Sequence, residues 1–385
     1  MLDRSPSEER LPPFTSIQLT GANNRWLVTT AGTLLNFSAP NYLGLADHPA
    51  VVSAAHEALN RFGSGPGAGP TVSGRSILHE ELEQALSSHL GVDSAVVMPS
   101  GSAANHAVLA GLVQAGDVII SDALNHASIV DGCRLSPADV RVVPHRSVAA
   151  VRDALSSARA AGARRVLIVT DGVFSVDGDI ADLASLASLR TDEDILIVVD
   201  DAHGLGVLGQ GRGTAAYAGV DPNTVITTSS FSKALGGFGG AVTGPGWAIE
   251  QIRERGRSYI FSAALPPPLT AAASAALELA FTTPLIDKLW TNQRRFVALL
   301  ASYGFAIRSP TPLLPLVLGD HAVTMQAARA LLRAGVLAVP LGPPVTPADA
   351  ARIRFVITAA HTDDDLATAA DALDNAITRR NRILL

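Results

Sequence analysis

The sequence predicts an α/β protein built on a large, mostly parallel sheet, followed by a smaller α+β domain. Between residues 94 and 228, apolar runs rich in β-branched residues alternate with Ala- and Leu-rich helical stretches. That alternation indicates right-handed βαβ units. Polar motifs follow directly after five of the apolar runs. Because ligands of parallel sheets bind at the carboxyl ends of the strands, these motifs indicate one site at one edge of the sheet.

The N-terminal segment, residues 1–45, is predicted to be an arm with a short hairpin around Trp26–Thr30. A helix is expected from Pro49 to about Phe62, because apolar residues recur there at helical spacing. The segment Gly63–Gly74 holds too many glycines and prolines for a helix or a strand. We expect an ordered loop here rather than a flexible linker, because another helix begins at Leu78.

The large domain is placed at residues 46–270 and the small domain at residues 271–385. The strands expected in the large domain are Ser94–Met98, Asp117–Ser121, Arg141–Val143, Val166–Thr170, Ile195–Val199 and Val225–Thr228. The helices between them are Ala103–Leu112, Ala149–Ala161 and Leu183–Leu189. The small domain is expected to hold strands at Leu313–Leu318 and Arg352–Ile357 and helices at Val323–Ala334 and Asp363–Ile377.

Composition narrows the classes of function. A formal net charge of −6 argues against a nucleic-acid partner. The single cysteine, Cys133, excludes a disulfide framework, fits a reducing compartment and is expected to be a packed thiol. The uncharged stretch Ser258–Leu277 contains three consecutive prolines, so we expect a loop entering a buried helix rather than a membrane span. These features predict a soluble cytoplasmic protein.

Lys233 stands in the Ser- and Gly-rich segment Thr227–Gly240, directly after a β-branched run. It is one of two lysines, with Lys288, in a chain whose other basic residues are arginines. Lysine, unlike arginine, can lose its proton near neutral pH and form a Schiff base with a carbonyl. Taken alone, Lys233 could also be an ordinary surface-turn residue. Its assignment therefore depends on the motifs that accompany it.

Asp200 ends a buried apolar strand, where a carboxylate is costly unless it meets a cation. A pyridinium nitrogen is such a cation. His203 could then donate a hydrogen bond to a ring hydroxyl, and His126, after the second strand, could stack on a flat ring. The alternatives are that Asp200 caps the next element and that His126 is a packing residue.

Ser100, Gly101 and Ser102 open the helix expected from Ala103. Backbone N–H groups and the helix dipole make such a start an anion site suited to a phosphate. A lysine, a strand-end aspartate, a ring-stacking histidine and this phosphate site together specify pyridoxal 5′-phosphate (PLP), an electron sink for carbanions next to an amine. No metal site is expected.

With these motifs the chain resembles the α-oxoamine synthases, a family that includes 8-amino-7-oxononanoate synthase, 2-amino-3-ketobutyrate CoA ligase, 5-aminolevulinate synthase and serine palmitoyltransferase. The resemblance covers roughly residues 33–365. Its most specific pieces are Asn41–Leu45, Ser121–Ser136, Thr170–Asp179, Val199–Gly204 and Phe231–Gly236. It implies the PLP-dependent transferase fold-type I, with a seven-stranded, mostly parallel sheet, and a homodimer whose active sites lie at the subunit interface.

The resemblance also implies roles for individual residues. Lys233 forms the Schiff base with PLP and then removes the substrate Cα proton, and Asp200 keeps the pyridine nitrogen protonated. His126 stacks on the ring. The remaining positions implied are His203 and Ser175 at the 3-hydroxyl side, Ser100, Gly101, Ser102, Ser230 and Ser262 (the last from the other subunit) at the phosphate, and Asn41, Ser73 and His126 at the substrate.

The implied reaction is a decarboxylative Claisen condensation of an amino acid with an acyl thioester, either acyl-CoA or an acyl-carrier protein, that gives an α-aminoketone. The chain departs from the family at Pro40, at Gly69-Pro70 and at Gly342, which aligns with an arginine that holds the substrate carboxylate. The candidate replacements for that arginine are Arg308, Arg352 and Arg354.

Three alternatives share parts of this pattern. Another fold-type I enzyme, such as an aldolase, racemase or aminotransferase, would use the same Lys233 and Asp200 without an acyl thioester. A Rossmann oxidoreductase would explain the GxGxxG match at Gly204–Gly209, but that match leads into Gln210–Gly213 rather than into a helix. A PLP-fold protein without catalysis would not need its lysine, aspartate and histidine intact.

Overall fold

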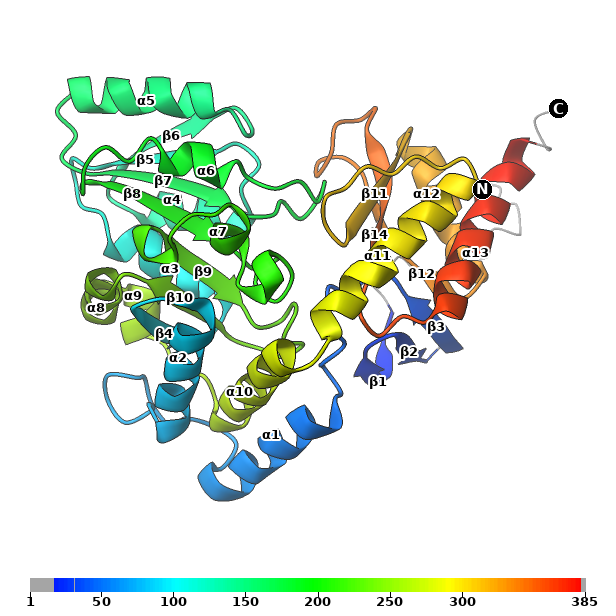
Figure 1. The fold of residues 1–385 in the computed structure, drawn as a ribbon, viewed down its shortest axis with the longest axis horizontal. Helices are drawn as coiled ribbons and strands as arrows, with labels where there is room; N and C mark the ends of the chain where they lie inside the picture. Colours follow the sequence, from blue (N-terminus) through cyan, green and yellow to red (C-terminus); the bar gives the residue numbers. More distant parts are fainter. Residues whose placement is uncertain (1–16, 31, 382–385) are drawn as a thin grey trace, which may run out of the picture.

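The structure is a computed structural model that describes residues 17–30 and 32–381. It contains a large lobe around a seven-stranded sheet and a second lobe around the C-terminal helices and strands (Figure 1). This architecture confirms the predicted α/β fold class with a smaller C-terminal domain. The predicted boundaries at residues 45 and 270 stay a prediction.

The large sheet has the strand order β4-β10-β9-β8-β7-β5-β6. The pairs β5–β6, β5–β7, β7–β8 and β8–β9 are parallel, and β10 runs antiparallel to β4 and β9. The strands are β4 (Ser94–Met98), β5 (Val118–Asp122), β6 (Asp139–Val143), β7 (Val166–Asp171), β8 (Ile195–Asp200), β9 (Ile226–Ser230) and β10 (Gly240–Gly244). All six predicted strands are present within one or two residues, and β10 is an addition.

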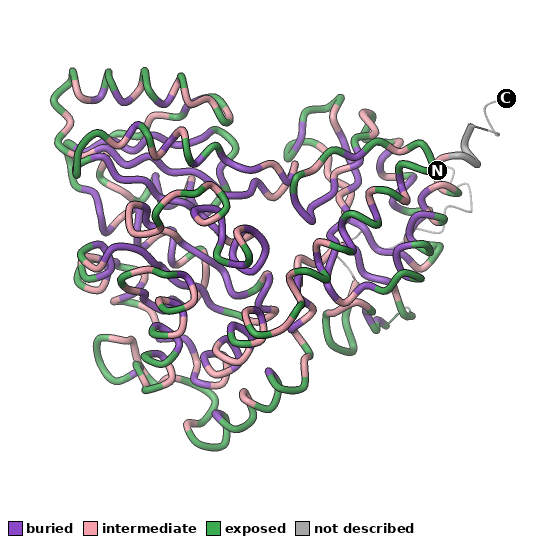
Figure 2. The backbone as a smooth tube through the Cα atoms, in the orientation of Figure 1, coloured by how far each residue is buried: buried purple, intermediate pink, exposed green. Residues whose placement is uncertain are grey.

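Helices cover both faces of this sheet, so its central strands are buried throughout their length (Figure 2). One face packs against α3 (Gly101–Gly111), α4 (Ala127–Leu135), α8 (Gly246–Arg255) and α9 (Arg257–Ile260). The other face packs against α5 (Val148–Ala160), α6 (Leu183–Ala187) and α7 (Thr214–Tyr217). Cys133 of α4 is a free thiol buried on the face covered by α3, α4, α8 and α9, as a packed thiol was predicted to be. Burial raises the pKa of Cys133 to about 11.

The second lobe contains a three-stranded sheet of order β11-β14-β13, formed by β11 (Leu313–Gly319), β14 (Ala351–Val356) and β13 (Val339–Leu341). Its helices are α11 (Leu285–Ser302), α12 (His321–Arg333) and α13 (Asp363–Asn381). The described part of the N-terminal arm lies on this lobe, because β3 (Gly32–Asn36) pairs with β12 (Val336–Leu337). The predicted hairpin is formed by β2 (Trp26–Thr29) and β3, and β1 (Leu19–Asn23) extends it.

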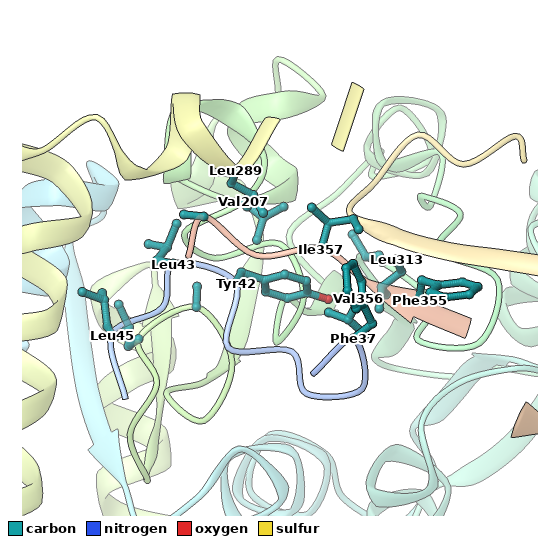
Figure 3. Close-up of a cluster of buried hydrophobic side chains, with 14 of the residues drawn as sticks. Phe37, Tyr42, Leu43, Leu45, Val207, Leu289, Leu313, Phe355, Val356 and Ile357 are labelled. Carbon is teal, nitrogen blue, oxygen red and sulfur yellow. The ribbon is translucent and has the colours of Figure 1, made fainter. Parts of the chain in front are cut away.

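Helices α1 (Pro49–Phe62), α2 (Ile77–Leu90) and α10 (Pro267–Thr282) pack together beside the large sheet. The segment after β3 carries the core from one lobe into the other (Figure 3). Phe37 stacks on Phe296 of α11 with ring centroids 5.3 Å apart, and Tyr42 is 1% exposed in the same cluster. The hydrophobic core that both lobes share therefore fixes Tyr42 close to His203, which follows β8 of the large sheet.

Among the described residues, no single helix is long and apolar enough to cross a membrane. The bent pair α10 and α11, which meet at 70°, passes the same test jointly, on length and composition alone.

Candidate active site

A cavity of about 230 Å³ lies at the carboxyl ends of β7, β8 and β9. It is lined by Ser100, Gly101, Ser102, His126, Ser128, Asp171, Val173, Ser175, Asp200, Ala202, His203, Ser230, Ser232, Lys233, Phe238 and Gly239. These include every predicted site residue except Asn41, Ser73 and Ser262. The parallel strands therefore bring together residues as far apart in sequence as Ser100 and Gly239, as the predicted topology requires.

Asp200 ends β8 and is 8% exposed. Its Oδ2 accepts a 2.6 Å hydrogen bond from Nδ2 of Asn105, and its Oδ1 accepts one of 3.0 Å from the backbone N–H of Ala202. Asn105 is fixed in turn by Thr228, whose hydroxyl donates to the amide oxygen at 2.6 Å. Asp200 lines the cavity and forms no ion pair within 4.0 Å with any described residue. A pyridinium nitrogen supplies the charge that this carboxylate lacks.

Asn105 was missed by the sequence analysis, which followed the start of α3 only as far as Ser102. Asn105 lies four residues after Gly101 and therefore on the same face of α3. This helical spacing is the sequence pattern that predicts a side chain directed at the sheet.

Lys233 follows β9 in a tight turn, with its Nζ 3.4 Å from the Ser232 hydroxyl. Burial lowers the pKa of Lys233. The nearby carboxylate of Asp200 opposes this shift, and the guanidinium of Arg354 adds to it. The amine therefore loses its proton more readily than a solvated lysine, which is what a Schiff-base or proton-accepting lysine requires.

His203 is held neutral. Burial moves its pKa well below the ordinary value, and the charges of Lys233, Arg354 and His126 add to the shift. The Tyr42 hydroxyl lies 2.7 Å from Nδ1, and burial raises the pKa of this phenol, which therefore keeps its proton. A phenol that donates to Nδ1 leaves the imidazole hydrogen on Nε2.

His126 is the N-cap residue of α4, and its Nδ1 lies 2.7 Å from the Ser128 hydroxyl. Asn125 fixes the preceding turn, because its Nδ2 donates to Ser121 and to the Val169 carbonyl, each at 2.9 Å. The imidazole of His126 is thus presented to the cavity by an anchored loop, as a stacking residue needs to be.

The N-terminus of α3 also lines the cavity, through Ser100, Gly101 and Ser102. Ser100 caps the helix by accepting a 3.1 Å hydrogen bond from the backbone N–H of Ala103. A Cβ on Gly101 would lie 2.9 Å from Cβ of Ser230, so glycine is required where these two segments meet. The hydroxyls of Ser230 and Ser232 lie 2.8 Å apart beside it. Helix N–H groups, hydroxyls, an uncompensated carboxylate and an amine in one cavity fit the phosphate, the ring nitrogen and the aldehyde of PLP.

The three predicted residues outside the lining lie elsewhere. Asn41 is buried in a turn, where it accepts from the backbone N–H of Leu45 at 3.0 Å and donates to Asn24 at 3.3 Å. Ser73 is exposed on the glycine-rich loop, and Ser262 lies beside that loop. The loop is ordered, as predicted, because the Ala264 N–H donates to the Ala68 carbonyl at 3.1 Å.

Of the three arginines considered as replacements at Gly342, Arg354 lies at the site. Its Nη1 donates a 2.6 Å hydrogen bond to the carbonyl of Ser175, and its buried Nε has no hydrogen-bond partner among the described residues. Arg352 is paired with Asp177 instead, and Arg308 is exposed.

The GxGxxG match at Gly204–Gly209 is a structural loop around a buried aspartate. Asp201 accepts hydrogen bonds from the backbone N–H and the hydroxyl of Thr214, at 3.0 and 2.5 Å. Leu205 and Arg212 form an isolated antiparallel bridge, so the segment folds back on itself instead of starting a helix. This geometry removes the Rossmann alternative.

The Aminotransferase class I and II family profile matches residues 32–373. The chain belongs to this family. Within it, the chain is similar to two 8-amino-7-oxononanoate synthases. That of Pelobacter propionicus is 42% identical over 94% of this chain and 93% of the relative, and 8-amino-7-oxononanoate synthase 1 of Bacillus subtilis is 39% identical over 89% and 87%. A solved structure of serine palmitoyltransferase with PLP has a TM-score of 0.91 and 30% identity, over 95% of this chain and 93% of that one.

These relatives are α-oxoamine synthases, which confirms the predicted family and its fold. The chain is therefore a PLP-dependent enzyme of the acyltransferase type, and PLP is its cofactor.

Proposed function

We propose that this enzyme condenses an amino acid with an acyl thioester, with loss of CO₂, to give an α-aminoketone, as an 8-amino-7-oxononanoate synthase does. The observation that carries the proposal is that Lys233 and Asp200 line one cavity and that Arg354 lies next to it, bonded to the carbonyl of the lining residue Ser175. These residues supply an amine, an anion and a cation at the positions that a cofactor-bound amino acid needs. The curated relatives at 39% and 42% identity support the same reaction.

PLP, when bound, supplies a ring that accepts the negative charge formed next to the substrate amine. Asp200 holds a proton at the ring nitrogen, and the hydrogen bonds from Asn105 and Ala202 orient its carboxylate. Lys233 accepts the proton from the substrate Cα, because burial favours its neutral amine.

The two histidines orient the ring. His126 forms one wall of the cavity, and Ser128 limits its rotation. His203, kept neutral by burial, presents its Nε2–H to the oxygen on the ring's 3-position together with Ser175. Ser100, Gly101, Ser102 and Ser230 bind the phosphate at the α3 N-terminus.

Arg354 anchors the substrate carboxylate. Its Nε is buried and has no hydrogen-bond partner among the residues that the structure describes. A guanidinium with such an unused donor next to a cavity favours a carboxylate. This assignment makes an arginine at position 342 unnecessary. There, a side chain would clash with the imidazole of His321.

The acyl donor is an acyl-CoA or an acyl-carrier protein, and the active unit is a homodimer in the cytoplasm. Val72 of the glycine-rich loop is 80% exposed and Phe261, next to Ser262, is 73% exposed. A second copy that covers these apolar residues would bring Ser73 and Ser262 to a site. Asn41 acts through the turn that it stabilises.

The test is a visible-absorption titration of the PLP-loaded enzyme with glycine, alanine and serine, each with and without an acyl-CoA. A cofactor band that changes with one amino acid, and changes again when the thioester is added, supports the proposal and identifies the amino acid. Turnover of an amino acid without any thioester would instead favour an aldolase, racemase or aminotransferase.

A further inference from the structure

A second buried carboxylate faces the same cavity, and the proposed reaction gives it no role. Asp171 ends β7 in register with Asp200 at the end of β8. Both residues line the cavity, and they are 5% and 8% exposed. Because side chains in register on neighbouring parallel strands point to the same face, the two carboxyl groups lie side by side.

The two carboxyl groups differ in how well they are stabilised as anions. Asp200 accepts hydrogen bonds of 2.6 Å from Asn105 and 3.0 Å from Ala202. Asp171 accepts one of 3.4 Å from the backbone N–H of His126, and it forms no ion pair with a described residue. The carboxylate of Asp200 is therefore better supplied with hydrogen-bond donors than that of Asp171.

The other ionisable groups around Asp171 do not compensate it. Asp122 and Asp179 add negative charge, and His145 bridges these two carboxylates at 2.9 and 2.8 Å instead of bonding to Asp171. Arg146 likewise lies 3.4 Å from Asp179. Burial first, and the charge of Asp200 second, hold the pKa of Asp171 well above its ordinary value. Two adjacent carboxylates in a dry site share one negative charge in the same way in other enzymes.

We propose that Asp171 is a neutral carboxylic acid that donates a hydrogen bond to an oxygen acceptor bound in the cavity, next to Asp200. It is thus a second acidic group of the site, with a role different from that of Asp200: it positions an acceptor and leaves the charge opposite the ring nitrogen to its neighbour. The acceptor is an oxygen of PLP, and this part of the inference rests on the proposed function. The protonation of Asp171 does not.

Infrared difference spectroscopy of the PLP-free protein at neutral pH tests the protonation. We expect a carbonyl stretch of a protonated carboxylic acid that is lost in Asp171→Asn and retained in Asp182→Asn. Asp182 is a matched control because it caps α6 outside the cavity. A wild-type spectrum without that band would overturn the inference whatever reaction the enzyme catalyses.

Equilibrium PLP binding tests the donor. Asparagine keeps a neutral donor of similar size, so Asp171→Asn should bind PLP within about threefold of the wild type, whereas Asp171→Ala should bind about tenfold more weakly. Raising the pH should remove the proton of Asp171 and so weaken PLP binding more in the wild type than in Asp171→Asn. The ionisation of PLP affects both proteins equally, so the difference between them reports Asp171 alone.

Equal loss of affinity in both variants would mean that an ionised Asp171 is needed, and unchanged affinity in both would mean that its donor reaches no bound group; either result contradicts the inference. If Asp171→Ala does not fold, the pH comparison of the wild type with Asp171→Asn still decides. Failure of the wild type to bind PLP would count against the proposed function and leave the infrared result standing.

Discussion

Asn105 of α3 donates a 2.6 Å hydrogen bond to Asp200, a residue 95 positions later in the chain. The same amide oxygen accepts from the Thr228 hydroxyl on the neighbouring strand. The carboxylate that faces the ring nitrogen is therefore oriented by a helix on one side and a strand on the other.

Asn105→Ala should weaken PLP binding about tenfold, because Asp200 loses its shortest donor in a buried setting. The dissociation constant can be measured by the quenching of protein fluorescence as PLP is added. Asn375→Ala, on the exposed face of α13, should leave it unchanged. Equal affinity in the wild type and Asn105→Ala would show that Asp200 is oriented by other groups.

Gly101→Ala should weaken PLP binding by at least tenfold. The new Cβ would lie 2.9 Å from Cβ of Ser230 and 3.4 Å from the Ser229 carbonyl, so the two phosphate-binding segments would have to separate. Gly246→Ala is the matched control, because a Cβ at that helix start has no neighbour within 4 Å. Wild-type affinity in Gly101→Ala would place the phosphate elsewhere.

Tyr42→Phe should lower kcat/KM about tenfold, because His203 loses the 2.7 Å contact that fixes its tautomer. The structure also predicts that wild-type activity does not depend on His203 protonation near its ordinary pKa, since burial holds the pKa well below that value. A pH–rate profile checks this, with Tyr217→Phe on the surface as control. An acidic limb that shifts in Tyr42→Phe would assign that limb to His203.

Arg354→Lys should raise KM for the amino acid at least tenfold and leave PLP affinity within about twofold. The planar guanidinium is lost from the cavity edge, while the residues that line the cofactor cavity are kept. Arg308→Lys, which changes an exposed arginine, is the control. A rise in KM for the acyl thioester alone would assign Arg354 to the other substrate.

Lys233→Met should abolish activity and yet stabilise the PLP-free protein at pH 7. Burial lowers the pKa of Lys233, so the folded state binds its proton less tightly than the unfolded state does. This cost is fully present below the folded pKa and disappears as the pH rises through the ordinary value of 10.5. Urea unfolding should therefore show a gain in Lys233→Met that shrinks between pH 7 and pH 10. A gain that is constant with pH would have another cause.

Sequence patterns predicted correctly those helices and strands whose positions are determined by their own residues. Helix α1 begins and ends where apolar spacing placed it, and β7 and β8 are continuous apolar runs because both of their faces are buried. Strand β10 was missed because Gly240–Gly244 is short, lies between glycines and depends on β4 and β9 for its hydrogen bonds.

Site residues, like helices and strands, could be predicted where a local motif identifies them. Lys233, Asp200 and His203 were predicted because each belongs to a local motif at a strand end. Asn105 and Tyr42 were missed because their partners are 95 and 161 residues away in sequence, and only the fold brings them together. Arg354 could be named as a candidate, but its choice over Arg352 depended on which of the two arginines pairs with Asp177.

The most direct test of the proposed reaction is the release of labelled CO₂ from a carboxyl-labelled amino acid, with and without an acyl thioester. We expect CO₂ release only when both substrates are present, together with an α-aminoketone of matching mass in equal amount. Release that is independent of the thioester, or consumption of the amino acid with its carboxyl group retained in the product, would contradict it.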